Sequence, residues 1–149
     1  MKKIDTLRFG SIEAEENQVI NFKQGIPAFE EEKEFLLIVP DETAPYAFLQ
    51  SVKTPELAFL MTRPFVFFPD YEFVLNDEIE EQLELKSEED LDVFAFITIP
   101  DGDIKKMTVN LLAPVVINKR ARFGQQYVLE KTKYTTAHAL FAAEAKEGK

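Results

Sequence analysis

The sequence lacks cysteine and tryptophan altogether and has only one histidine and five glycines among its 149 residues. Without cysteine there is no thiol nucleophile, cysteine-ligated zinc or iron-sulfur cluster, and a reducing compartment fits. The scattered glycines form neither a Walker A loop nor a dinucleotide-binding fingerprint. The few serines form no G-x-S-x-G motif. These absences disfavour nucleophilic catalysis and enzymes that cradle phosphate groups.

Long hydrophobic runs are also missing. No apolar stretch approaches the roughly 18 residues of a membrane-spanning helix, and Lys2 and Lys3 are not followed by the apolar stretch of a signal peptide. The composition, 46% hydrophobic and 30% charged, is nevertheless too apolar for a disordered chain. We therefore expect a single domain over residues 1–149, located in the cytoplasm and without contact with a membrane.

Short apolar runs rich in phenylalanine and β-branched residues are what the chain has instead. They cover residues 19–22, 35–39, 57–62, 93–99, 104–110, 115–117 and 125–129. Most are bounded by proline, glycine or aspartate, and Asp101-Gly102 favours a hairpin turn between the runs at 93–99 and 104–110. The pattern predicts a mainly β, antiparallel, barrel-like fold of about eight or nine short strands.

Two helices are expected among the strands. Asn76 is a suitable cap for a short acidic helix over residues 77–83, where Ile79 and Leu83 lie on one face. Ser87 is a similar cap for a brief turn at 88–90. An alanine-rich segment predicts a C-terminal helix over residues 136–145. His138 would be a partly exposed residue of that helix, with a general-base role as the alternative.

Charge is concentrated in one segment. The chain has 17 basic and 27 acidic residues, a formal net charge of -10, and eleven of the acids but only one base lie between Asp70 and Asp92. The rest of the chain is neutral as a set. A localised charge of this kind concerns partners and not the fold.

Three other features each have a plain and a functional interpretation. Lys119, Arg120 and Arg122 beside Phe123 could contact a protein, but a solvated loop is expected, and the net charge opposes direct binding of nucleic acid. The aromatic residues between Pro64 and Tyr71 belong to the core or form a partner-facing patch at the barrel rim. Asp101-Gly102-Asp103 lacks the later ligands of a calcium loop, so no metal site is expected.

Several segments together resemble the bacterial flagellar assembly factor FliW family over roughly residues 3–140. The segments are Phe22-Lys23-Gln24-Gly25-Ile26-Pro27-Ala28-Phe29-Glu30, Phe48-Leu49-Gln50-Ser51, Pro64 with Phe68-Pro69-Asp70-Tyr71, residues 108–118, and Gly124-Gln125-Gln126. The resemblance implies a small β-barrel protein with no catalytic activity and no cofactor. It also implies binding to flagellin and, when flagellin has been exported, binding to the RNA-binding translational repressor CsrA, which couples flagellin translation to secretion.

Charge then suggests where such partners would bind. CsrA must present basic residues to RNA, so we expect an acidic surface of Asp77, Glu78, Glu80, Glu81 and Glu84 to attract it. The amphipathic ends of flagellin need an apolar groove, for which Phe65, Phe67 and Tyr71 are candidates. The alternatives are a solvated acidic helix that confers only solubility, a flagellin chaperone without a role in RNA regulation, and a small enzyme that uses paired carboxylates.

Overall fold

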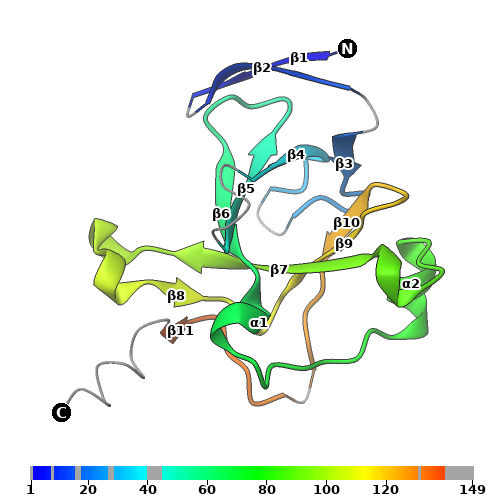
Figure 1. Cartoon of the computed structure of the whole chain (residues 1–149), viewed down its shortest axis with the longest axis vertical. Coiled ribbons are helices and arrows are strands. Elements are labelled where there is room, and N and C mark those ends of the chain that lie inside the picture. Colours follow the sequence, from blue (N-terminus) through cyan, green and yellow to red (C-terminus); the bar gives the residue numbers. More distant parts are fainter. Residues whose placement is uncertain are drawn as a thin grey trace.

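Strands make up most of the regular structure in this computed structural model, which describes residues 2–7, 9–15, 18–26, 29–39, 45–130 and 132–139 (Figure 1). The described residues contain eleven strands, more than the eight or nine expected. They are β1 (Lys2–Thr6), β2 (Gly10–Ala14), β3 (Val19–Asn21), β4 (Glu34–Ile38), β5 (Tyr46–Ser51), β6 (Ala58–Thr62), β7 (Leu91–Thr98), β8 (Thr108–Val109), β9 (Val115–Asn118), β10 (Phe123–Gln126) and β11 (His138–Ala139). The prediction of a mainly β fold is confirmed.

The helical segments in the same described residues are short. They are the α-helices α1 (Pro64–Phe67) and α2 (Asp77–Gln82) and the 3₁₀ turns η2 (Glu88–Asp90), η3 (Pro100–Gly102) and η4 (Ile104–Lys106). Within this described part of the chain, no helix has the length and apolar character that crossing a membrane requires.

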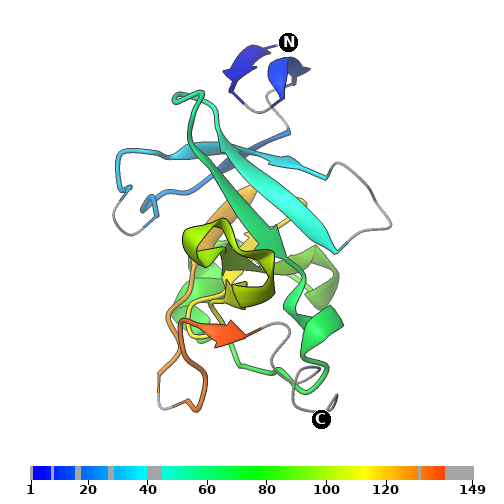
Figure 2. The ribbon, with the colours of Figure 1, turned by 90° about the vertical axis from the view of Figure 1, so that its left-hand side faces the viewer.

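Seven strands close into a barrel. Their order is β7-β6-β5-β4-β3-β10-β9, and the ring closes because β9 also pairs with β7. Every neighbouring pair is antiparallel except β3 and β10, which meet in parallel at Asn21 and Phe123. The sheet continues beyond β7 with β8 and β11, while β1 and β2 form a separate ribbon at the N-terminal end (Figure 2). The predicted antiparallel barrel is confirmed, with one parallel pair.

The barrel interior explains why β9 is a continuous apolar run. Val115 and Ile117 point into the main core beside Phe22 and Phe35, whereas Val116 belongs to a separate cluster beneath α2. A strand that is buried on both faces does not alternate between apolar and polar residues. The main core consists of Ile20, Phe22, Ile26, Phe35, Ala47, Leu49, Met61, Phe94, Val115 and Ile117.

The expected hairpin at Asp101-Gly102 forms with a shorter second strand. Strand β7 pairs with β8 at Ile97 and Val109, but residues 104–106 form the 3₁₀ turn η4 and not a strand. Asp101 and Gly102 both have positive φ angles, 53° and 73°, so the chain bends sharply before it returns. Lys105 and Lys106 are exposed in the wide connection that results.

The predicted C-terminal helix is wrong over its first residues. His138 and Ala139 form β11, which pairs with Val109 and Thr108 of β8, and the remainder of the predicted helix lies outside the described residues. Just before β11, the carbonyl of Thr135 accepts hydrogen bonds from two backbone N–H groups, those of Leu111 and Leu112. Main-chain pairing with an available sheet edge outweighs intrinsic helix propensity, which tertiary contacts override even for alanine.

Candidate protein-binding groove

The acidic segment folds as the predicted helix. The side-chain Oδ1 of Asn76 accepts a hydrogen bond of 2.9 Å from the N–H of Ile79 and so caps α2. Ile79 and Leu83 are buried against Val93 and Val116. This packing turns the acidic side chains of α2 toward solvent, where Asp77, Glu78, Glu80 and Glu81 are all exposed. The brief turn at 88–90 also forms, as η2, although the Ser87 side chain makes no capping hydrogen bond.

Asn118, a residue with no role in the sequence-based hypothesis, holds the end of α2. Its side chain is fully buried and donates hydrogen bonds to the carbonyls of Leu83, at 2.7 Å, and Glu84, at 3.1 Å. Its Oδ1 accepts hydrogen bonds from the N–H groups of Arg120, at 2.9 Å, and Ala121, at 3.0 Å. One amide therefore joins the helix to the loop between β9 and β10.

Ion pairs neutralise part of the acidic segment. Asp92 pairs with Arg63, Asp90 with Arg120 at 3.3 Å, and Glu84 with Lys23 at 3.9 Å. Asp90 also accepts a hydrogen bond from the backbone N–H of Lys86, and this bond, with the Arg120 guanidinium, lowers the pKa of its carboxyl. The bases come from outside the segment, so sequence position alone did not show these pairs.

Four acids of α2 remain without an ion pair. Within the described residues, no base lies within ion-pair distance of Asp77, Glu78, Glu80 or Glu81. Ion pairs therefore neutralise three of the eleven acids of this segment, and the acids of α2 are among those that remain free to meet a partner within the described structure. Glu84, the fifth acid predicted for this surface, is exposed but pairs with Lys23.

The basic loop between β9 and β10 is largely used within the chain. Besides its pair with Asp90, Arg120 donates a hydrogen bond of 2.8 Å to the carbonyl of Glu84. Arg122 donates to the carbonyl of Gln18 at 2.7 Å, and partial burial lowers its pKa. These contacts support the interpretation of the three bases as part of a loop and leave Lys119 as the exposed base without such a contact in the described structure.

The aromatic stretch splits between surface and core. Phe65, in α1, is 44% exposed and its neighbour Val66 is 57% exposed. Phe67 is half-buried against Tyr46. Tyr71 is only 3% exposed and donates a hydrogen bond of 2.7 Å from its hydroxyl to the carbonyl of Leu111, and burial raises its pKa above the ordinary value. Of the three aromatic candidates, Phe65 is thus the one at the surface.

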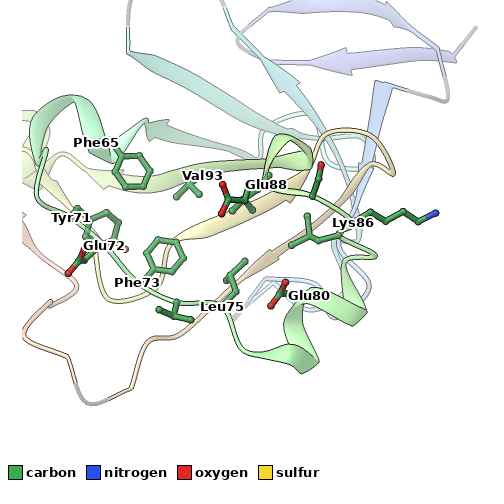
Figure 3. A pocket seen from close by; sticks show the side chains of 13 residues that line it. Phe65, Tyr71, Glu72, Phe73, Leu75, Glu80, Lys86, Glu88 and Val93 are labelled. Atoms are coloured by element: carbon green, nitrogen blue, oxygen red, sulfur yellow. The ribbon is translucent and has the colours of Figure 1, made fainter.

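A groove of about 530 Å³ brings the aromatic and acidic segments together (Figure 3). One wall is the chain from Tyr71 to Leu75, and Phe65 and Val93 lie opposite. Glu80 faces this space from α2, whereas Lys86 extends away from it. The lining residues are Phe65, Tyr71, Glu72, Phe73, Val74, Leu75, Glu80, Leu85, Lys86, Ser87, Glu88, Leu91 and Val93.

The groove combines some of the predicted site residues and omits others. Phe65, Tyr71 and Glu80 line it, but Phe67 and the remaining acids of α2 do not. The sequence-based hypothesis missed Phe73 and Leu75, which belong to a short apolar run after the aromatic stretch. Because two walls come from segments on either side of α2, only the fold shows that they face each other.

The contacts of His138 indicate a structural role. Its Nε2 accepts a hydrogen bond of 2.8 Å from the backbone N–H of Thr135, and its ring lies near those of Phe68 and Tyr134. Burial lowers its pKa, which favours the neutral form that can accept this bond. In the parts of the chain that the structure describes, no three histidine or carboxylate side chains are grouped to hold a metal ion.

Comparisons with known proteins agree in sequence and in fold. The sequence profile of the family described as FliW protein matches residues 3–140. The chain is 45% identical over 139 residues to the flagellar assembly factor FliW of Moorella thermoacetica, covering 93% of this chain and 88% of that relative. It is 44% identical over 146 residues to that of Desulfitobacterium hafniense strain DSM 10664 / DCB-2, covering 98% and 95%. A crystal structure of the flagellar assembly factor FliW matches with a TM-score of 0.88 and 41% identity, covering 96% of this chain and 99% of that one.

Proposed function

The chain belongs to the FliW family of flagellar assembly factors, and from this membership we propose that it is a partner-switching regulator of flagellin synthesis. In this proposal it binds flagellin in the cytoplasm and, once flagellin has been exported, binds the repressor CsrA and relieves repression of flagellin translation. Its relatives are flagellar assembly factors, a family without enzymatic activity, so the prediction that the chain is not an enzyme is confirmed.

The observation that carries the CsrA half of the proposal is the unpaired acidic face of α2. Its acids are exposed, are fixed by the Asn76 cap and by the packing of Ile79, and have no ion-pair partner in the described structure. A protein that binds RNA phosphates must present bases, so this face would attract CsrA over several ångströms and repel RNA once docked.

The apolar groove supports the flagellin half. Phe65, which lines the groove, and its neighbour Val66 are large exposed apolar side chains, a feature more typical of protein contact surfaces than of solvent-facing ones. The Phe65→Ser variant should therefore weaken flagellin binding, while the acidic face of α2 remains intact. Its capture of CsrA serves as the internal control.

Charge reversal on α2 tests the CsrA half. The double variant Glu78→Lys with Glu81→Lys should associate with CsrA about tenfold more slowly at low salt, and with a flatter salt dependence. The matched control is Glu30→Lys with Glu31→Lys, which changes the net charge equally at exposed acids far from α2 in the sequence. Stopped-flow measurements at low and high salt give the association rates of both double variants with CsrA. Equal rates for the two variants would refute the role of α2.

Partner exchange is the test of the whole proposal. Tagged protein should capture flagellin and CsrA separately, and each should displace the other. Capture of flagellin alone would instead favour a dedicated chaperone without a role in RNA regulation. Capture of neither protein would refute the proposal.

A further inference from the structure

We propose that residues 72–75 form an open strand edge, and that an extended peptide segment with alternating apolar and basic residues binds there by main-chain hydrogen bonds within the groove. This inference rests on the proposed function, because it takes the groove to be a partner surface. It adds the manner of binding and the chemistry of the bound segment.

The side chains of this segment alternate as those of a strand do. Tyr71, Phe73 and Leu75 are buried or half-buried, whereas Glu72 and Val74 are exposed, and Val74 is 87% exposed. A period of two is the signature of an extended chain. None of these residues has a positive φ angle, and no regular secondary structure is assigned to them.

The main chain of the segment is only partly paired in the described structure. The N–H of Glu72 donates to the hydroxyl of Tyr134 at 3.2 Å, and the carbonyl of Val74 accepts from the hydroxyl of Tyr127 at 3.4 Å. In an extended chain residues two apart direct their backbone groups to the same side, so those of Phe73 and Leu75 point to the opposite side. The N–H groups of Phe73 and Leu75 have no hydrogen-bond partner anywhere in the described structure.

The edge is held in place at both ends. The hydroxyl of Tyr71 bonds to the carbonyl of Leu111 before it, and the side chain of Asn76 caps α2 after it. Between these points Phe73 and Leu75 pack against the cluster that contains Val93. A preorganised edge reduces the conformational entropy that binding must overcome.

The groove also selects the chemistry of the bound segment. Its walls include Phe65, Leu91 and Val93, and three acids, Glu72, Glu80 and Glu88, lie along it. The base among the lining residues, Lys86, extends away from the space. An added strand alternates its side chains, so apolar residues would meet the walls while lysine or arginine meets the acids. A helical ligand bonds its own backbone and would leave the edge of 72–75 unused.

N-methylated peptides test the main-chain pairing directly. The probe is a fluorescein-labelled hexapeptide that alternates valine and lysine, and binding to the full chain is measured by anisotropy. Two further peptides carry N-methyl groups on all valines or on all lysines. Because one set of amides faces the receptor edge and the other faces away, one of the methylated peptides should bind about tenfold more weakly and the other nearly as the parent does. Equal binding by both, whether retained or lost, would overturn the proposal.

Variants and amide exchange locate the bound peptide. Glu80→Gln with Glu88→Gln should weaken binding by about tenfold, whereas the control Glu78→Gln with Glu81→Gln, at acids that do not line the groove, should change it less than twofold. The parent peptide should also slow hydrogen exchange at the amides of Phe73 and Leu75. Exchange that stays unchanged at both amides would overturn strand addition.

The two proposals can fail separately. If the chain captures flagellin and CsrA but not the alternating peptide, the strand edge is refuted and the proposed function stands. If it binds the peptide with the expected N-methyl pattern but captures neither protein, the strand edge stands and the proposed function fails.

Discussion

At the scale of single residues, Gly25 meets two separate requirements. Its φ angle is +69°, and a Cβ there would lie 2.5 Å from the carbonyl oxygen and 2.6 Å from the Cα of Glu30. Gly10 has a similar φ of +70° but open space around it. We expect Gly10→Ala to cost about 1–2 kcal/mol of unfolding free energy, from the backbone alone, and Gly25→Ala at least about 2 kcal/mol more. Urea denaturation measures the loss of unfolding free energy in each variant. Equal losses would contradict the close approach of Gly25 to Glu30.

Glu32 links stability to pH at the same scale. Hydrogen bonds from the hydroxyls of Ser51 and Thr54 hold the pKa of its carboxyl below the ordinary value of 4.5. A pKa that is lower in the folded state stabilises the fold above the unfolded pKa, and this contribution disappears as the pH falls through the folded pKa.

The expected contribution of Glu32 is modest, under about 1 kcal/mol, because solvent screens a partly exposed group. The free energy of unfolding measured in urea should therefore be larger for the wild type than for Glu32→Gln at about pH 6. This difference should shrink toward about pH 3. Glu56→Gln, at an exposed carboxylate without a hydrogen bond in the described structure, is the control. A difference that grows on acidification would have the wrong sign.

At the scale of elements, the attachment of α2 depends on Asn118. Its four hydrogen bonds join the helix end to the loop after β9, and that helix contributes Glu80 to the lining of the groove. We expect Asn118→Ala to lower the free energy of unfolding by about 2–4 kcal/mol, since it leaves buried backbone groups without partners. Asn110→Ala, which removes a single side-chain hydrogen bond to Ala113, should cost about 1 kcal/mol. Similar losses in urea denaturation would contradict the role of Asn118.

At the scale of the whole molecule, the closed ring should be the most stable unit. Its strands surround the main core, whereas the ribbon of β1 and β2 lies outside the ring and packs through Ile4 and Ala14 against Leu36. Native-state hydrogen exchange should show amides of Leu49 and Ile117 opening only with global unfolding, and those of β1 and β2 opening at least about tenfold more often. Equal protection of the ribbon and the ring would show a single cooperative unit.

The overall charge takes a different meaning in the folded molecule. A net charge of -10 concentrated between Asp70 and Asp92 indicated an acidic surface. Folding pairs Asp90, Asp92 and Glu84 with bases that are distant in the sequence, and it leaves the four acids of α2 free of ion pairs within the described structure. Which acids are available to a partner is therefore a property of the fold.

Local sequence was sufficient for the elements whose signals are short-range. The Asn76 cap, the spacing of Ile79 and Leu83, and the prolines that border β7 and β9 all act within a few residues, and these predictions are confirmed. The first residues of the predicted C-terminal helix were wrong because their competitor was the edge of β8, nearly 30 residues earlier in the chain. A local helix propensity does not reflect a pairing strand that is so distant in the sequence.

The sequence by itself determined the mainly β class, the capped acidic helix and, through its motifs, the resemblance to the FliW family. These features depend on residue types and short spacings, which can be recognised in the sequence without knowledge of the fold. Only the tertiary structure decided the ring closure through β9 and β7, the burial of Tyr71, the role of Asn118 and the groove itself. Each of these joins segments that are far apart in the chain, and such contacts exist only once the barrel has closed.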